Sequence, residues 1–315
     1  MTKLILSTSN IMSSGPSILR RPTSQKSNVE LVNSLRGNFR ASKQAVTLAR
    51  DGKHTSQQDG DITNNEIPYE TWTVKENDSL YIPSIDFESS GLVEERGQYD
   101  ITVKLFFLPG TSASQRCQHA KEAIDVVLKE LNMPSIDLLI VSFPGVTLDS
   151  SMDCHDPVSG DVPSGEGEDL NAMTKTWKAL EWLQEEGLAR RIGVAEFGKD
   201  RLQNFLHRTK IRPAVDQISL KDNCTVPKPL LELAKQENIA LLEHMDCTNI
   251  LPSGTIRELL GPGPNGAGVL AGPSGQSDGI KGDIAPQWVI KYTAVVENRG
   301  VIENRGYFAM AELRQ

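Results

Sequence analysis

Cysteine, positive charge and long apolar runs are all scarce in this chain of 315 residues. Its four cysteines include no Cys-x-x-Cys pair, which excludes a disulfide framework. Lysine and arginine number 33 against 41 acidic residues, and the net charge of −8 argues against a protein that binds nucleic-acid backbones. No run approaches the ~18 apolar residues of a membrane span, and the early run at 4–6 is too short for a signal peptide. We therefore expect a cytoplasmic protein without membrane or nucleic-acid partners.

Four polar stretches interrupt the chain, at about 11–27, 50–66, 145–170 and 261–283. The last of them is close to half glycine and proline and has no three-residue period, which excludes collagen and is typical of a flexible insertion. We predict that all four are flexible segments of one domain that spans residues 1–315.

Strand-like and helix-like patterns alternate between these stretches. Apolar strand runs occur at 101–107, 136–141, 192–195, 215–220 and 239–242, and helical spacing of apolar residues occurs at 120–131, 173–183, 202–206 and 227–234. Such alternation predicts a parallel α/β sheet. No strand leads into G-x-G-x-x-G, so a closed (β/α)8 TIM barrel is favoured over an open dinucleotide-binding sheet.

The C-terminal segment 286–315 is expected to close that barrel. Trp288, Val289, Tyr292 and Val296 recur at helical spacing, and Val301 with its neighbour follows a glycine as a short strand would. In a barrel the last strand–helix unit packs against the first, so this segment should be needed for a stable fold.

Three segments of the central region resemble the barrel of the aldo-keto reductases. They are 131–144 (LNMPSIDLLIVSFP), 176–187 (TWKALEWLQEEG) and 191–197 (RIGVAEF), and the match extends over roughly 101–245. The resemblance implies a (β/α)8 barrel with an NADPH site at the carboxyl ends of its strands.

A narrower resemblance covers more of the chain. The segments 223–230 (NCTVPKPL), 241–244 (LLEH), 287–292 (QWVIKY) and 298–307 (NRGVIENRGY) are similar to the modifier, or regulatory, subunits of glutamate–cysteine ligase. This family resemblance implies a non-catalytic subunit that forms a heterodimer with the catalytic subunit and activates it in the first step of glutathione biosynthesis. The chain has no G-x-x-x-x-G-K-[ST] loop that would suggest ATP binding of its own.

The reductase resemblance also assigns positions to a site. Lys104 fits the lysine that tunes a catalytic tyrosine, and Gln217 persists. Ser142 stands where the catalytic histidine should end its strand. Ala195 and Glu196 replace the Ser-Asn pair that holds the nicotinamide amide.

Two further departures bear on catalysis. His244 stands at the position of the aromatic residue that stacks on the nicotinamide, and no tyrosine between 60 and 100 lies in the expected Asp-x-Ala-x-x-Tyr-Gly context. We therefore predict a pseudoenzyme with no catalytic residues, no metal and no cofactor. The Asp-Cys-His-Asp run at 153–156 is interpreted as a solvated loop, because zinc ligands are usually spaced two to four residues apart.

Two alternatives stay open: a divergent NADPH-dependent reductase, and a module that senses NADPH without turnover. Lys104 itself lies within an apolar strand, where a lysine is rarely buried without a partner. It is interpreted either as a remnant of the reductase site or as one half of an internal ion pair with Glu196 or Glu243.

Overall fold

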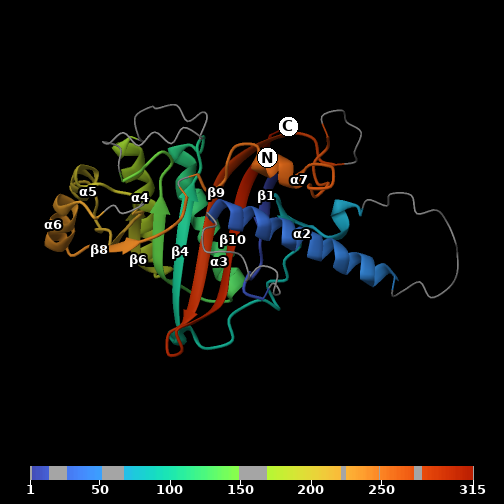
Figure 1. The fold of residues 1–315 in the computed structure, drawn as a ribbon, viewed down its shortest axis with the longest axis horizontal. Helices are drawn as coiled ribbons and strands as arrows, with labels where there is room; N and C mark the ends of the chain where they lie inside the picture. The colour runs from blue at the N-terminus through green and yellow to red at the C-terminus, as the bar shows by residue number, and fades with distance from the viewer. Residues whose placement is uncertain are drawn as a thin grey trace.

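The computed structural model describes residues 2–13, 27–51, 67–148, 169–220, 225–247, 249–272 and 279–314. These residues form one ten-stranded mixed sheet with helices on both faces (Figure 1). The strands are β1 (Thr2–Ser7), β2 (Val74–Glu76), β3 (Ser79–Ile82), β4 (Tyr99–Phe107), β5 (Ile136–Ser142), β6 (Ala189–Ala195), β7 (Val215–Ile218), β8 (Ala240–Glu243), β9 (Asp283–Val296) and β10 (Val301–Arg314). The helices are α2 (Ser27–Asp51), α3 (Ala113–Leu131), α4 (Leu170–Glu185), α5 (Lys199–Leu206), α6 (Lys228–Glu237) and α7 (Thr255–Leu260), with 3-10 turns at Tyr69–Thr71 and Arg96–Gln98.

One half of the sheet is the predicted parallel array. Strands β4 to β8 pair side by side in chain order, and α3, α4, α5 and α6 connect them. Local sequence explains where these elements end. Asn132 closes α3 in the left-handed conformation (φ 50°), with Pro134 following, and Asp169 begins α4 by accepting the backbone N–H of Asn171 at 3.1 Å. The predicted alternation is confirmed.

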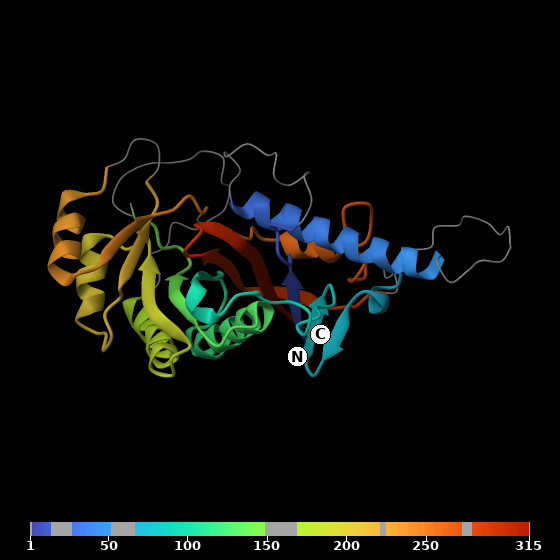
Figure 2. The ribbon, with the colours of Figure 1, turned by 90° about the horizontal axis from the view of Figure 1, so that it is seen from below.

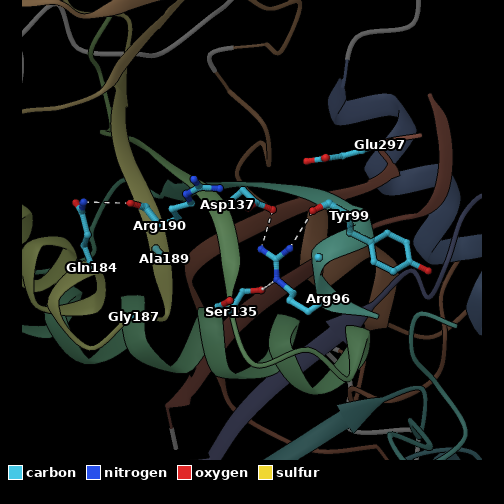
Figure 3. Close-up of a pocket in the computed structure, with 10 residues that line it drawn as sticks. Arg96, Tyr99, Ser135, Asp137, Gln184, Gly187, Ala189, Arg190 and Glu297 are labelled. Carbon is cyan, nitrogen blue, oxygen red and sulfur yellow. Dashed lines mark hydrogen bonds and ion pairs between the residues drawn. The ribbon is translucent and has the colours of Figure 1, made fainter. Parts of the chain in front are cut away.

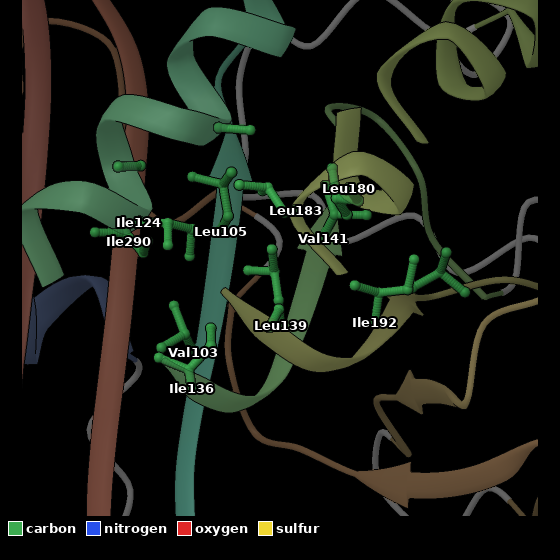
Figure 4. Packing of buried hydrophobic residues seen from close by; sticks show 14 of the residues in the cluster. Val103, Leu105, Ile124, Ile136, Leu139, Val141, Leu180, Leu183, Ile192 and Ile290 are labelled. Carbon is green, nitrogen blue, oxygen red and sulfur yellow. The ribbon is translucent and has the colours of Figure 1, made fainter. Parts of the chain in front are cut away.

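The core of this half lies between the sheet and the connecting helices (Figure 4). Val103 and Leu105 of β4 and Leu139 of β5 meet α3 and α4, and all three are fully buried. Gly193 permits β6 to approach β7, because a Cβ atom there would lie 2.7 Å from the carbonyl oxygen of Val215. The apolar runs therefore form buried parallel strands, as strands covered by helices require.

The other half of the sheet is antiparallel, except that β1 pairs with β3 in parallel, and it corrects a prediction. The C-terminal segment forms a long hairpin, β9 and β10, rather than a strand–helix unit, and the hairpin lies between β4 and β1 in the sheet. Trp288 faces the α3 side and Val289 faces the opposite side, and both are fully buried. Because both faces of β9 are covered at 287–290, four consecutive residues there are buried. The apolar residues of this strand therefore also match a helical spacing.

A second core lies on the face of the sheet opposite α3. Figure 2 shows α2 on one side of β9 and β10 and α3 on the other. Residues 261–272, expected from composition to be flexible, pack into this second core through Ala267, Val269 and Leu270, each less than 5% exposed. The remaining parts of the four predicted flexible segments fall largely outside the described residues, at 14–26, 52–66, 149–168 and 273–278.

The sheet does not close into a barrel within the described ranges. It ends at β8 on one side and at β2 on the other. The α/β class with parallel strands holds, but the expected closure does not, because the chain after β8 forms α7 and glycine-rich turns instead of another parallel strand. Among the helices that the structure describes, none has the length and apolar character needed to cross a membrane.

Candidate functional site at the carboxyl ends of the parallel strands

The structure brings the six sequence-predicted positions to one end of the parallel strands. They lie at or near the carboxyl ends of neighbouring strands: Lys104 on β4, Ser142 on β5, Ala195 and Glu196 at β6, Gln217 on β7 and His244 after β8. Backbone hydrogen bonds fix Glu196 and His244. The N–H of Glu196 donates to Gln217 O at 2.9 Å, and that of His244 donates to Ile218 O at 3.0 Å. This is the end at which (β/α)8 enzymes carry their active sites.

Lys104 lies in a charge cluster whose centre is Asp246. Lys104 and Lys291 are directly opposite each other on β4 and β9, an arrangement of like charges that is unfavourable alone. Asp246 lies between them, with one carboxylate oxygen 3.0 Å from Lys104 Nζ and the other 2.8 Å from Lys291 Nζ. The side chains of Lys104 and Asp246 are about 5% exposed. The predicted internal ion pair of Lys104 therefore exists, but its partner is Asp246 rather than Glu196 or Glu243.

Burial and neighbouring charge shift the pKa values of Lys104 and Asp246 in opposite directions. Burial lowers the pKa of Lys104, an effect that Asp246 opposes. The two lysines hold the pKa of Asp246 well below its ordinary value despite its burial. Asp246 is thus a fixed counter-charge and has no free proton to exchange at neutral pH.

A second close contact joins Glu196 to His244. One carboxylate oxygen of Glu196 lies 2.6 Å from His244 Nε2, and the other accepts the backbone N–H of Leu148 at 3.1 Å. The backbone N–H of Asp246 donates to His244 Nδ1 at 3.1 Å, so this ring nitrogen acts as an acceptor. Glu196 adopts a left-handed backbone (φ 65°), which is uncommon for a residue with a side chain.

The other positions of the site contribute little chemistry. Ala195 is buried, and Ser142 and Gln217 are half-buried. The side-chain oxygen of Gln217 has no hydrogen-bond partner among the residues that the structure describes. Asp216, which sequence reasoning did not single out, is fully buried and accepts the N–H of Phe197 at 3.2 Å. Burial raises its pKa well above the ordinary value, so its neutral form is favoured.

No tyrosine is suited to act as the general acid at this end of the strands. The chain has five tyrosines, and the pKa of each is raised, in every case chiefly by burial. Tyr307 has its ring 6.0 Å from Lys291 Nζ, but its hydroxyl donates to Glu30 at 2.5 Å. A general acid works best with a pKa near the operating pH, and these shifts move every tyrosine away from it.

The residues present fit a nicotinamide only in part. A carboxamide needs both a donor and an acceptor; the Gln217 amide offers both, whereas the Glu196 carboxylate, already paired to His244 and Leu148, can only accept. The His244 side chain is 8% exposed and held in that pair, so its ring has no free face for stacking. Among the described residues, no group of histidine, cysteine and acidic side chains could hold a metal ion.

A polar pocket of about 580 Å³ lies at the opposite, amino end of the strands (Figure 3). Its floor is Arg96, whose guanidinium donates to Ser135 O at 2.8 Å, to Tyr99 O at 2.9 Å and to Asp137 at 2.7 Å. With these donors committed, Arg96 acts as a clamp between β4 and β5. None of the six predicted site positions lines this pocket.

Known proteins resemble this chain over the same region. The model of the aldo/keto reductase family matches residues 88–256. A putative glutamate–cysteine ligase regulatory subunit of Schizosaccharomyces pombe is 27% identical over 252 residues, 76% of this chain and 79% of that protein. The glutamate–cysteine ligase regulatory subunit of Homo sapiens is 24% identical over 221 residues, 70% of this chain and 69% of that protein.

A reductase is also similar over a shorter region. The NADPH-dependent D-xylose reductase of Candida boidinii is 34% identical over 158 residues, 44% of this chain and 49% of that protein. Both resemblances stated from the sequence are thus confirmed. Since the family model matches more than half of its residues, the chain belongs to the aldo/keto reductase family.

Proposed function

We propose that this chain is a regulatory subunit of glutamate–cysteine ligase that binds the catalytic subunit and performs no reductase chemistry itself. Its role lies in the first step of glutathione synthesis, and its place of action is the cytoplasm. The relatives that match most of its length carry the name of such a subunit, which supports the assignment.

The observation that carries the non-catalytic part is the set of partners of Lys104. In the reductases that this chain resembles, a lysine and an aspartate together tune a tyrosine acid; here Lys104 Nζ pairs with Asp246, 3.0 Å away, but hydrogen-bonds to no tyrosine among the described residues. The hydroxyl of Tyr307 donates to Glu30 instead, and burial raises its pKa. The Lys104–Asp246 pair therefore has no hydroxyl beside it that could act as the acid in carbonyl reduction.

Co-purification with the catalytic subunit of the same organism tests the proposal. We expect a stable complex in which the formation of γ-glutamylcysteine is faster, or less sensitive to glutathione, than with the catalytic subunit alone. The purified chain alone should form no γ-glutamylcysteine and reduce no carbonyl with NADPH. Failure to form a complex would contradict the regulatory assignment.

A divergent NADPH-dependent reductase is the second candidate, favoured by Lys104 and by the similarity to a xylose reductase. Quenching of protein fluorescence by NADPH, measured together with turnover of a panel of aldehydes, separates the candidates. Turnover clearly above that of a Lys104→Met control would support the reductase. Binding without turnover would support an NADPH-sensing module, and neither is expected.

A further inference from the structure

The polar pocket at the amino ends of the strands has no part in the proposed function. Its volume of about 580 Å³ is that of a site for a small molecule. Its walls come from four neighbouring strands, in the order β9, β4, β5 and β6. Because it lies at the end of the strands opposite the six predicted positions, it is a separate candidate site.

Two of the charges in this pocket neutralise each other. The Arg96 guanidinium donates to a carboxylate oxygen of Asp137 at 2.7 Å, and the same oxygen accepts the backbone N–H of Ile101 at 2.8 Å. This ion pair forms the floor of the pocket between β4 and β5. It gives the pocket a fixed shape but no net charge that could select a ligand.

The other two charges of the pocket are free. Arg190, at the start of β6, and Glu297, just after β9, are both exposed. Neither side chain forms an ion pair or a hydrogen bond within the part of the chain that the structure describes. Figure 3 shows them on opposite sides of Arg96. The pocket therefore presents one free cation and one free anion in separate places.

These two charges select the chemical class of the ligand. A simple anion would be attracted by Arg190 and repelled by Glu297, and a simple cation would meet the reverse. A ligand with a carboxylate at one end and an ammonium group at the other satisfies both, because a guanidinium donates to carboxylate oxygens and a carboxylate accepts from an ammonium group. Amino acids and peptides with free ends have this chemistry.

The spacing of the strands sets the length of that ligand. Neighbouring strands lie ~4.8 Å apart, so the three steps from β9 to β6 separate the backbones of Glu297 and Arg190 by about 14 Å. An extended peptide of two or three residues spans about 7–11 Å, and the two side chains can reach across the rest. A single amino acid is too short to contact both charges.

We propose that this pocket binds a short peptide of two or three residues with free ends, its carboxylate on Arg190 and its ammonium group on Glu297. Gly97 and Gly187 leave space for the peptide, because a Cβ atom added at either position would have no other atom within 4 Å. The site is independent of the proposed function, so either can fail without the other.

Calorimetric titration of the purified chain with triglycine tests the site. Triglycine should bind. N-Acetyltriglycine, which lacks the ammonium group, and triglycine amide, which lacks the carboxylate, should each bind at least tenfold more weakly, and so should glycine, which is too short to bridge the two charges. No binding of triglycine, or equal affinity for the four compounds, would overturn the proposal.

Substitutions test which residue holds each end of the peptide. Arg190→Gln should weaken triglycine at least tenfold without affecting triglycine amide, and Glu297→Gln should weaken triglycine equally without affecting N-acetyltriglycine. Arg191→Gln is the matched control, since Arg191 is also exposed but does not line the pocket, and it should bind as the wild type does. Gly97→Leu fills the open space and should abolish binding without lowering the melting temperature. A control that weakens triglycine as much as Arg190→Gln does would overturn the proposal.

Discussion

The two halves of the ten-stranded sheet are assembled by different kinds of contact. In the parallel half, β4 to β8, each strand pairs with the next one in the chain through a single connecting helix. In the antiparallel half, β1 pairs with β10, and β9 pairs with β4 across nearly 190 residues of sequence. The family model, at 88–256, covers the parallel half and leaves β1, β9 and β10 outside.

This difference locates the stability of the chain. The hairpin β9–β10 lies in the middle of the sheet and supplies residues to both cores, so it joins the two halves. The charged cluster lies at the same junction, where Lys104 of β4 meets Lys291 of β9. The hairpin does not reach β8, which pairs only with β7 among the described strands. We therefore expect substitutions at the junction to change stability most.

Truncation before Trp288 should have the largest effect. The deletion removes most of β9 and all of β10, and so exposes β4 and β1, whose neighbours they are. We expect aggregated or molten material, seen as loss of the near-ultraviolet circular dichroism signal and of a single elution peak. Trp288→Ala alone should cost about 3–5 kcal/mol, because the ring is fully buried. A monodisperse, well-folded truncation would show that the parallel half is independent of the hairpin.

Breaking the charge cluster at the junction should cause the second-largest loss of stability. Asp246→Asn leaves the buried Lys104 facing the half-buried Lys291 without a counter-charge and should reduce the free energy of unfolding by about 3–5 kcal/mol in urea titrations. Adding Lys104→Met should recover part of the loss by removing one of the like charges. Glu94→Gln is the control: it breaks an exposed pair with Arg299 and should change stability by about 0.5 kcal/mol or less. Equal effects at the two sites would mean that the cluster is not structural.

The sequence predicted the parallel half of the sheet better than the antiparallel half. Apolar spacing within α3 and the unbroken run of β5 are local signals, and they predicted the parallel half. The hairpin could not be read in this way, because Trp288 and Val289 are both buried and blur the period of two that reveals a strand. Its pairing with β1 and β4 depends on contacts far apart in sequence.

The candidate site was likewise predicted only in part. The reductase resemblance placed Lys104 and Glu196 in one site, and the position of a lysine within an apolar strand indicated a carboxylate partner. Which carboxylate it is could not be predicted, because Asp246 lies in the loop after β8, where no periodicity fixes the direction of a side chain. Lys291 was missed because the segment that carries it was interpreted as a helix. A search for every carboxylate near the strand ends would have included Asp246.

The pH dependence of stability should have opposite signs at two carboxyl groups. Burial against the sheet raises the pKa of Glu130 on α3 to about 7, so its uncharged form is favoured in the folded state. Its contribution is present below the unfolded pKa and is lost as the pH rises from about 4.5 to 7, worth about 3 kcal/mol. The depressed pKa of Asp246 acts in reverse, since its contribution is lost only as the pH falls through the acid range.

Glu130→Gln should remove the first of these slopes. Urea unfolding at pH 5 and at pH 8 should show the wild type less stable at pH 8. The variant should show a smaller difference, because Asp216, whose pKa burial also raises, still acts in the same direction. Glu297→Gln, at an exposed position, should keep the wild-type difference. A variant that retains the slope would assign it to other groups of the protein.

The smallest effect is expected from a deletion within the last glycine-rich segment. This segment contains a polar stretch next to residues that pack into the second core. Residues 273–278 (PSGQSD) hold no aliphatic or aromatic side chain, whereas Leu270 just before them is 1% exposed. Hydrogen bonds of 3.0 and 2.8 Å between the flanking segments, from Ala271 N–H to Ile280 O and from Ile280 N–H to Val269 O, hold the two ends together. Deleting 273–278 should therefore change stability by no more than about 0.6 kcal/mol, since loop entropy varies slowly with length. Leu270→Ala should cost about 2–5 kcal/mol in the same assay, and a deletion as costly as that substitution would contradict the distinction.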